Sequence, residues 1–396
     1  MKDRVPRYPG RVQLTPVPGQ ANTYDLVRAD DPAEAGTPLN KASLLQDNTA
    51  TALGLSGDPT VNDALARLSW GTLPANYFGG VVLRVLDPQN RPVPGMSFTG
   101  LSTFAGSDRA TNSNGELVLL FPEDTSLSVR PVQLIGYTQP AAQTIRPAEG
   151  DFNIYTYRYT GTGARVGDVF TFTTSTTIVF PIAIARVDVF LLAAGGSGGR
   201  GMSEGGGGGG GGEARNLMNL AVMPRPYALL VGAGGPSSGG GTDGGGTVFD
   251  TTTVNGGQKG SDGNSSTGGG NGGSGGGGGA SNGAGGNGGI NGANGNAGAG
   301  SSGNPGGIGS GVVARKFNLS ANPMLGNGGG GGAYGTPGGT AGTGAGAGGA
   351  TNMAGASAID EQGGGGGGGG RVNSGSVYGG DGGNGIIEIR IAAIAA

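Results

Sequence analysis

The amino-acid sequence predicts a mainly β protein that begins with a small helical segment, continues as a β-sandwich and ends in a β-cored domain with packed polyglycine II helices. Short apolar alternations separated by turn residues occupy residues 78–160. Of the 96 glycines, 79 follow Ala194, where the composition changes abruptly. Patterned strands flank these glycine runs. We therefore predict three domains, at residues 1–70, 78–160 and 161–396.

The composition excludes several classes of protein. The chain has no cysteine, so it holds no disulfide scaffold, thiolate nucleophile or zinc finger. It has no histidine, which excludes a Ser-His-Asp triad, an imidazole base and a histidine-ligated metal. A net charge of -3 argues against nucleic-acid binding, because phosphate neutralisation needs a clustered basic surface.

Two helix-start signals lie in residues 1–70. Thr37 followed by Pro38 fits an N-cap with proline at the first helical position, and Thr60 begins a pattern like a capping box. The apolar side chains of this segment are too few to bury a core alone. We expect it either to attach to other chains and oligomerise or to pack as a helical hairpin on the next domain.

A family resemblance covers about 55 residues of this first segment. The strings at residues 6–16, 24–30 and 36–42, in that order, resemble the N-terminal module of tail-fibre-like proteins from phages and prophages of Gram-positive bacteria. The resemblance implies attachment to a phage tail or baseplate. The residues expected to make this attachment are Tyr8, Arg11, Leu39 and Leu45.

The second segment, residues 78–160, has the pattern of a β-sandwich. Val81, Leu83 and Val85 alternate with other residues, and Asn114-Gly115 forms a turn signal between two apolar runs. With its Pro and Gly positions, the segment resembles the carboxypeptidase-regulatory-like or transthyretin-like sandwich. That resemblance implies a structural spacer or binding module without catalytic residues. Arg91 stands where the family has a glycine, so the first turn is expected to differ.

Strands recur between the glycine runs of residues 161–396. Residues 187–192 and 387–391 alternate clearly between apolar and other side chains, and weaker alternation marks 170–172, 227–231 and 313–319. The glycine runs themselves fit four structures: flexible linker, collagen, silk-like stacking and packed polyglycine II helices. Collagen is excluded because glycine does not occupy every third position, and silk-like stacking because regular Ala or Ser alternation is missing.

Packed polyglycine II helices fit the sequence better than a linker. Such a helix has three residues per turn and no internal hydrogen bonds, so its N–H and C=O groups point outward to neighbours. Only glycine lets the axes come close on every side. Ordering each residue costs roughly 1–2 kcal/mol, so dense hydrogen bonding on a β core must offset the lost entropy. The order of strands and glycine runs resembles the glycine-rich domain of phage tail and receptor-binding proteins, which implies receptor contact through loops at the helix ends.

Catalytic signals are weak. Asp30-Asp31 and Asp360-Glu361 are adjacent in sequence, and neighbours in an extended chain point to opposite sides. The Gly-Asp-Gly pattern around Asp381 only faintly matches calcium-binding repeats, because the period does not recur. We expect no enzymatic activity, no cofactor and no bound metal ion.

Receptor contacts are expected from the non-glycine islands between the glycine runs. The candidates are Tyr334, Thr336, Asp360, Glu361, Arg371, Asn373 and Tyr378. An alternative for Tyr334 and Tyr378 is that they cap helix ends or fill the β core.

Taken together, these resemblances imply a structural virion protein, a tail fibre or receptor-binding protein that attaches phage to a bacterial surface protein or glycan. By analogy with fibres we expect a homotrimer in the virion tail, with no nucleic-acid binding and no membrane insertion. No signal peptide is visible, so synthesis in the host cytoplasm is expected. The alternatives are a non-adhesive decoration or linker protein of the tail and a polysaccharide-degrading tail spike.

Overall fold

The computed structural model of the chain describes residues 77–101, 110–264, 268–280, 293–297, 315–334 and 337–395. Near the N-terminus it describes the backbone of four short strands: β1 (Val5–Pro6), β2 (Val12–Pro16), β3 (Tyr24–Arg28) and β4 (Pro32–Glu34). There β1 pairs with β4 and β2 with β3, both antiparallel. The helices predicted in residues 1–70 lie outside the described residues. So do Tyr8, Arg11, Leu39 and Leu45.

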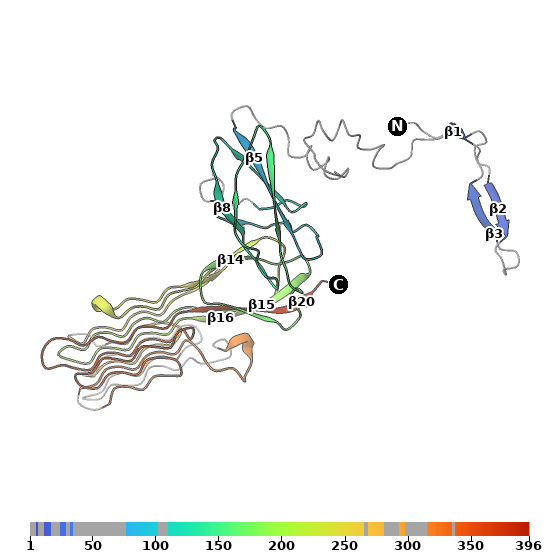
Figure 1. The fold of residues 1–396 in the computed structure, drawn as a ribbon. Coiled ribbons are helices and arrows are strands. Elements are labelled where there is room, and N and C mark those ends of the chain that lie inside the picture. Colours follow the sequence, from blue (N-terminus) through green and yellow to red (C-terminus); the bar gives the residue numbers. More distant parts are fainter. Residues whose placement is uncertain are drawn as a thin grey trace. The chain divides into compact units, whose positions relative to one another are not determined.

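The described structure is mainly β, with several antiparallel sheets, as the sequence predicts (Figure 1). The chain forms two compact units, one from Met1–Val81, Val118–Thr125 and Arg146–Asn153, the other from Val82–Leu117, Ser126–Ile145 and Ile154–Ala396. Everything below about the β core and the glycine runs concerns the second unit. Within the described residues, no helix has the length and apolar character needed to cross a membrane.

Residues 77–160 form two small sheets and contribute one further strand, β9, to a third sheet. One has the order β11-β5-β12, with β7 also paired to β5, and the other has the order β10-β8-β6. Tyr157 is fully buried and its hydroxyl donates to the carbonyl of Val129 at 2.9 Å. Arg91, where the resemblance led us to expect a different turn, donates from Nε to Asp87 Oδ2 at 2.7 Å. The strands are β5 (Gly79–Leu86), β6 (Phe98–Thr99), β7 (Glu116–Phe121), β8 (Leu127–Pro131), β9 (Gln133–Leu134), β10 (Gln143–Ile145), β11 (Ala148–Glu149) and β12 (Phe152–Arg158).

Two further sheets form the β core, which is built from residues 161–395 together with the short strand β9. One is antiparallel with the order β13-β20-β15-β16, and the other has the order β19-β18-β17-β14-β9, in which only β9 runs parallel to its neighbour. The strands are β13 (Val169–Phe172), β14 (Thr176–Val179), β15 (Ile184–Leu192), β16 (Ala214–Ala221), β17 (Pro226–Leu230), β18 (Thr247–Phe249), β19 (Thr252–Val254) and β20 (Ile386–Ile394).

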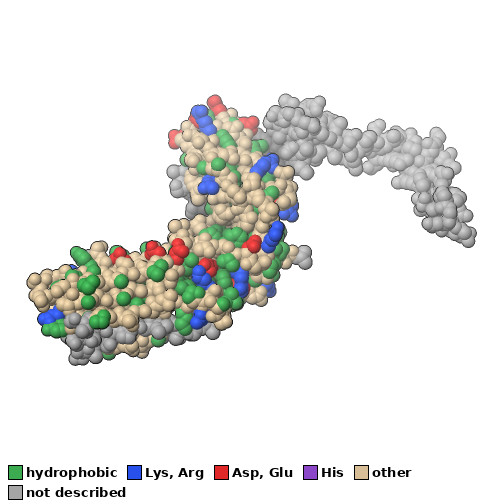
Figure 2. Space-filling model, turned by 60° about the horizontal axis from the view of Figure 1, so that its bottom comes forward, with side chains coloured by type: hydrophobic (Ala, Val, Ile, Leu, Met, Phe, Trp, Pro, Cys, Tyr) green, Lys and Arg blue, Asp and Glu red, His purple; other side chains and the backbone are tan. Residues whose placement is uncertain are grey.

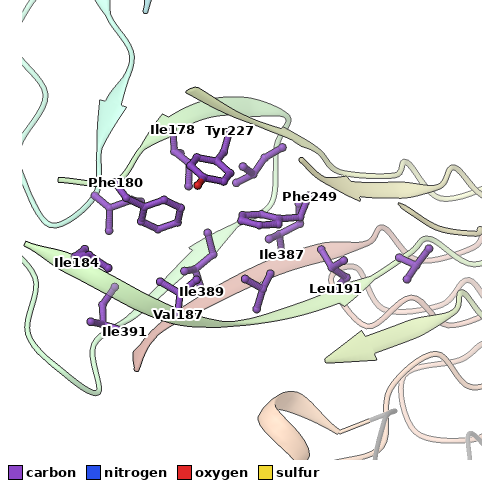
Figure 3. Close-up of a cluster of buried hydrophobic side chains, with 14 of the residues drawn as sticks. Ile178, Phe180, Ile184, Val187, Leu191, Tyr227, Phe249, Ile387, Ile389 and Ile391 are labelled. Atoms are coloured by element: carbon purple, nitrogen blue, oxygen red, sulfur yellow. The ribbon is translucent and has the colours of Figure 1, made fainter. Parts of the chain in front are cut away.

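Apolar side chains of both sheets meet in one buried cluster. Ile387, Ile389 and Ile391 of β20 point into it, as the sequence alternation predicts. Figure 3 shows Tyr227 and Phe249 from the second sheet packing above these isoleucines and beside Phe180. The rings of Tyr227 and Phe249 are stacked with centroids 5.7 Å apart. Because β20 and β15 are far apart in sequence but paired along their length, this cluster closes the domain.

The opposite face of β15 and β20 holds a second cluster. Phe190 and Ile386 pack there with Phe317, and Lys316 Nζ lies 2.5 Å from Glu388 Oε1. The sequence around Phe317 predicts a strand, but the structure has the short 3-10 helix η3 (Lys316–Asn318). The prediction was wrong because Phe317, at φ 53, leaves the extended conformation so that its ring and the Lys316 ammonium both reach this face.

Candidate functional site

The strands of the β core continue directly into the glycine runs. β15 leads into residues 193–201, and residues 205–212 lead into β16 (Figure 1). Residues 377–385 likewise lead into β20. Hydrogen-bonded strands lie about 4.7–4.9 Å apart. The β core therefore fixes both the spacing and the direction with which the glycine segments start.

Segment 205–212 has a hydrogen-bond pattern that repeats every three residues. Gly206, Gly209 and Gly212 each donate at 2.8 Å to one neighbour, segment 363–369. The intervening amides donate to two further segments, and the carbonyls accept from three more. These other five neighbours are 196–199, 255–261, 270–273, 274–277 and 329–332. Three residues per turn, with every backbone hydrogen bond made to a neighbouring segment, is the polyglycine II arrangement.

Side chains are excluded from this central helix by close backbone contact. A Cβ added at any of its eight glycines would lie 1.9–2.3 Å from a carbonyl oxygen of another segment. Real Cβ atoms do not come that close. Segment 363–370 is equally buried and also bonds to segments on several sides. The two longest glycine runs are thus the interior of a hydrogen-bonded lattice, which we call the polyglycine lattice.

Outer helices of the lattice show a period-three pattern of burial. In segment 255–263, Gly257, Gly260 and Gly263 are buried, while Gln258 and Lys259 between them are exposed. Glycine faces the lattice and side chains face the solvent. The spacing of non-glycine residues therefore tells which helices are outer ones.

The turns at the end of the lattice away from the β core form one surface. The amide of Arg371 donates to Ala333 O, that of Asn352 to Arg371 O, and that of Val372 to Met202 O, at 2.7–2.9 Å. We define the far-end surface as residues 200–204, 262–264, 334, 350–353 and 371–378. In Figure 2, Lys and Arg side chains are sparse over the lattice, and one blue group lies at its left end.

The structure brings together four of the seven predicted receptor-contact residues. Tyr334, Arg371, Asn373 and Tyr378 lie on the far-end surface, with Tyr334 and Tyr378 exposed by 40% and 54%. Thr336 lies outside the described residues.

The acidic pair Asp360 and Glu361 lies at the other end of the lattice, close to the β core. Their turn precedes Gly363, where an added Cβ would meet Ala193 and Leu192, and Asp360 Oδ1 accepts from the amide of Asn384 at 3.3 Å.

Several far-end residues were missed by sequence reasoning. Arg200 forms a two-pronged ion pair with Asp262 Oδ2, at 3.1 Å from Nε and 2.7 Å from Nη2, and this hydrogen bonding raises the pKa of the arginine. Met202 and Asn352 reach the surface in turns that contact other turns: Met202 O accepts from the amide of Val372, 170 residues away in sequence, and the Asn352 amide donates to Arg371 O, 19 residues away. No local sequence pattern marks either residue.

The far-end surface offers stacking and hydrogen bonding. The guanidinium of Arg371 lies over the Tyr334 ring, with Cζ 3.7 Å from its centroid. Met353 beside them is 60% exposed. Planar aromatic and guanidinium groups held by a rigid backbone are typical anchors of a binding surface.

A pocket of about 100 Å³ lies elsewhere in the second unit. Its lining is largely apolar and includes Pro94, Leu134, Tyr137, Phe180 and Ile182. Burial raises the pKa of the Tyr137 phenol, and the Asp87 carboxylate adds to this effect. Polar groups that could orient a ligand are few here, so the far-end surface is the stronger candidate.

Comparison with known families decides the class of the C-terminal part. A model of the glycine-rich domain matches residues 171–392. The chain belongs to this glycine-rich domain family. The matched region of the glycine-rich domain begins in β13, ends in β20 and includes the whole polyglycine lattice. A search of curated proteins finds no match to the chain.

Proposed function

We propose that this chain is a structural virion protein, a tail fibre or receptor-binding protein of a phage, which attaches to the bacterial surface through the far-end surface. The observation that carries the proposal is the six-neighbour packing of segment 205–212. The glycines of a flexible tether would not form hydrogen bonds to neighbouring segments on every side. An ordered lattice can hold turns in fixed positions at a distance from the β core.

Fixed turns favour binding for a physical reason. Loops on a rigid scaffold lose little conformational entropy when a partner binds, so more of the contact energy appears as affinity. Tyr334 and Tyr378 expose large ring surfaces at the far end. Tyrosine and arginine are the side chains that most often dominate binding surfaces.

The N-terminal resemblance supports the other half of the proposal. Residues 1–70 would mount the protein on a tail or baseplate, residues 78–160 would act as a spacer, and the glycine-rich domain would reach the host. We further propose a homotrimeric assembly in the virion and recognition without catalysis.

Adsorption blocking tests the proposal. Purified full-length protein is added to host cells before the phage, and free phage is counted. We expect the wild type to block adsorption, and the double variant Y334A/Y378A to lose at least ten-fold in blocking potency. L230A is the matched control, because Leu230 is 52% exposed on β17 but lies outside the far-end surface.

Two outcomes would contradict the proposal. Normal adsorption of virions that lack the protein would indicate a decoration or linker role. Release of soluble sugar from cell envelopes by the purified chain would indicate a polysaccharide-degrading spike.

A further inference from the structure

Arg371 differs from the other half-buried cations in the described part of the glycine-rich domain, which all have hydrogen-bond or ion-pair partners. Arg315 donates from Nη1 to the backbone carbonyls of Ser320 and Asn322. Arg200, Arg225, Lys316 and Arg390 each have a carboxylate partner at 2.5–2.7 Å. Arg371 has no carboxylate partner among the described residues, and its Nε is buried without any hydrogen-bond partner. A partly desolvated cation without a counter-charge attracts anions more strongly than a fully hydrated one.

The position of Arg371 is fixed by the lattice. Its amide donates to Ala333 O at 2.9 Å and its carbonyl accepts from the amide of Asn352 at 2.7 Å. Its guanidinium is stacked on the Tyr334 ring. Stacking holds the guanidinium plane while its Nη groups keep their capacity to donate, which is the geometry that suits two-pronged binding of an oxyanion.

A short polar loop follows Arg371 directly. Asn373, Ser374 and Ser376 are exposed, and Gly375 makes the turn with φ 82. The loop is held at both ends, because buried Val372 donates to Met202 O and Val377 bonds in both directions with Gly201. Its amide and hydroxyl groups are hydrogen-bond donors within five residues of Arg371 in sequence. The carboxylate of Asp262, also on the far-end surface, is already bound by Arg200.

We propose that Arg371, stacked on Tyr334, and the loop 373–376 form a binding site for an oxyanion, a phosphate or carboxylate carried by a polymer of the host surface. The assignment of the anion to a host polymer rests on the proposed function, but the anion site itself does not. A phosphate-bearing and a carboxylate-bearing polymer share this chemistry.

NMR titration of the full chain tests the site directly. Inorganic phosphate and, in a second arm, acetate are added at constant ionic strength, and the signals of Arg371 Nε–H and of the 373–376 amides are followed. We expect saturable shifts with half-saturation in the millimolar range. The arm with the tighter half-saturation identifies the type of anion.

Matched variants distinguish specific anion binding at this site from a non-specific effect of added salt on the whole protein. R371Q should abolish the saturable shifts of the loop amides. R371K should weaken half-saturation several-fold, because an ammonium lacks the planar fork. The control is R215Q, which removes an exposed arginine of β16 and should change nothing. Linear shifts, or loop shifts that persist in R371Q, would overturn the site.

Adsorption blocking then distinguishes the two proposals. If R371Q loses anion binding but still blocks phage as well as wild type, the receptor contact does not use this anion site, and the proposed function stands. If wild type binds phosphate but blocks no adsorption, the proposed function fails and the anion site stands. Loss of both properties in R371Q, with R215Q unaffected, supports both proposals.

Discussion

The β core and the polyglycine lattice are two buried interiors built by opposite means. In the β core, Phe249, Ile387 and Ile389 exclude water with their side chains, and the strand hydrogen bonds lie within the sheets. In the lattice, segment 205–212 has no side chains and bonds in all lateral directions. One interior depends on apolar surface and the other on the absence of Cβ atoms.

The two interiors tolerate different kinds of substitution. Side-chain cores accept apolar replacements of similar volume at a cost of less than about 1.5 kcal/mol. The lattice does not tolerate even a small side chain in the same way, because a Cβ at its centre meets a backbone oxygen of a neighbouring helix that is already hydrogen-bonded. A single methyl group should therefore cost more in the lattice than a lost ring costs in the β core.

The largest expected effect is that of Gly209→Ala. Its Cβ would lie 2.1 Å from Gly196 O, so segment 205–212 or segment 193–201 must move and break its hydrogen bonds to the other helices. We expect the free energy of unfolding to fall by about 5 kcal/mol, at the upper end for single substitutions. Urea unfolding followed by circular dichroism measures it.

A matched control is Gly246→Ala, the same chemical change at the edge of the β core. There the nearest atom to the added Cβ is Val254 O at 3.1 Å, and a small shift relieves the contact. We expect a loss below about 1 kcal/mol. Equal losses at the two positions would contradict the lattice as the reason for glycine.

Phe249→Ala should have the next largest effect. Phe249 is 1% exposed and stacks on Tyr227, so its removal leaves a cavity, and we expect a loss of about 3–4 kcal/mol. Because the strands continue into the glycine helices, amide protection should fall in segments 205–212 and 363–370 as well. Unchanged protection there would show that the lattice is stable without the β core.

A smaller loss of stability is expected at high pH, and only in residues 77–160. Burial raises the pKa of Tyr157 to about 12, and burial also raises the pKa of Tyr159. The unfolded chain loses these protons near pH 10, so stability is full below pH 10 and falls as pH rises toward 12, by about 1.4 kcal/mol per pH unit for each tyrosine.

Urea midpoints between pH 9 and 12 check this expectation, and Y157F should reduce the slope. The interior glycines of the lattice carry no side chain that titrates. A transition of segment 205–212 with the same pH dependence would show that the two regions unfold together.

The sequence predicts the fold where all residues of one type have the same surroundings, such as apolar side chains in the β core or glycines in the lattice. The alternation of Ile387, Ile389 and Ile391 predicts β20, and the glycine runs predict packed polyglycine II helices such as segment 205–212. The prediction from sequence fails around Phe317, where apolar alternation predicts a strand. There the packing against Phe190 and the ion pair of Lys316 with Glu388 decide the backbone, and both partners are distant in sequence.

The candidate site is predictable only in part. Exposure of Tyr334 and Tyr378 follows from their place between glycine runs. The separation of Asp360 and Glu361 from them does not, because the end of the lattice at which a turn lies depends on how often the chain has reversed before it. The stacking of Arg371 on Tyr334 joins two turns 37 residues apart in sequence, and no local pattern encodes it.

The outward side chains of the outer helices have a consequence for solubility. A stack of bare backbones has no natural boundary, since each new chain exposes the same unsatisfied amides and carbonyls to the next molecule. Ala354 and Ser357 on one rim and Gln258 on another hold such a molecule too far away for it to bond. We therefore expect these few exposed side chains to oppose sideways growth of the lattice into a fibre or a precipitate.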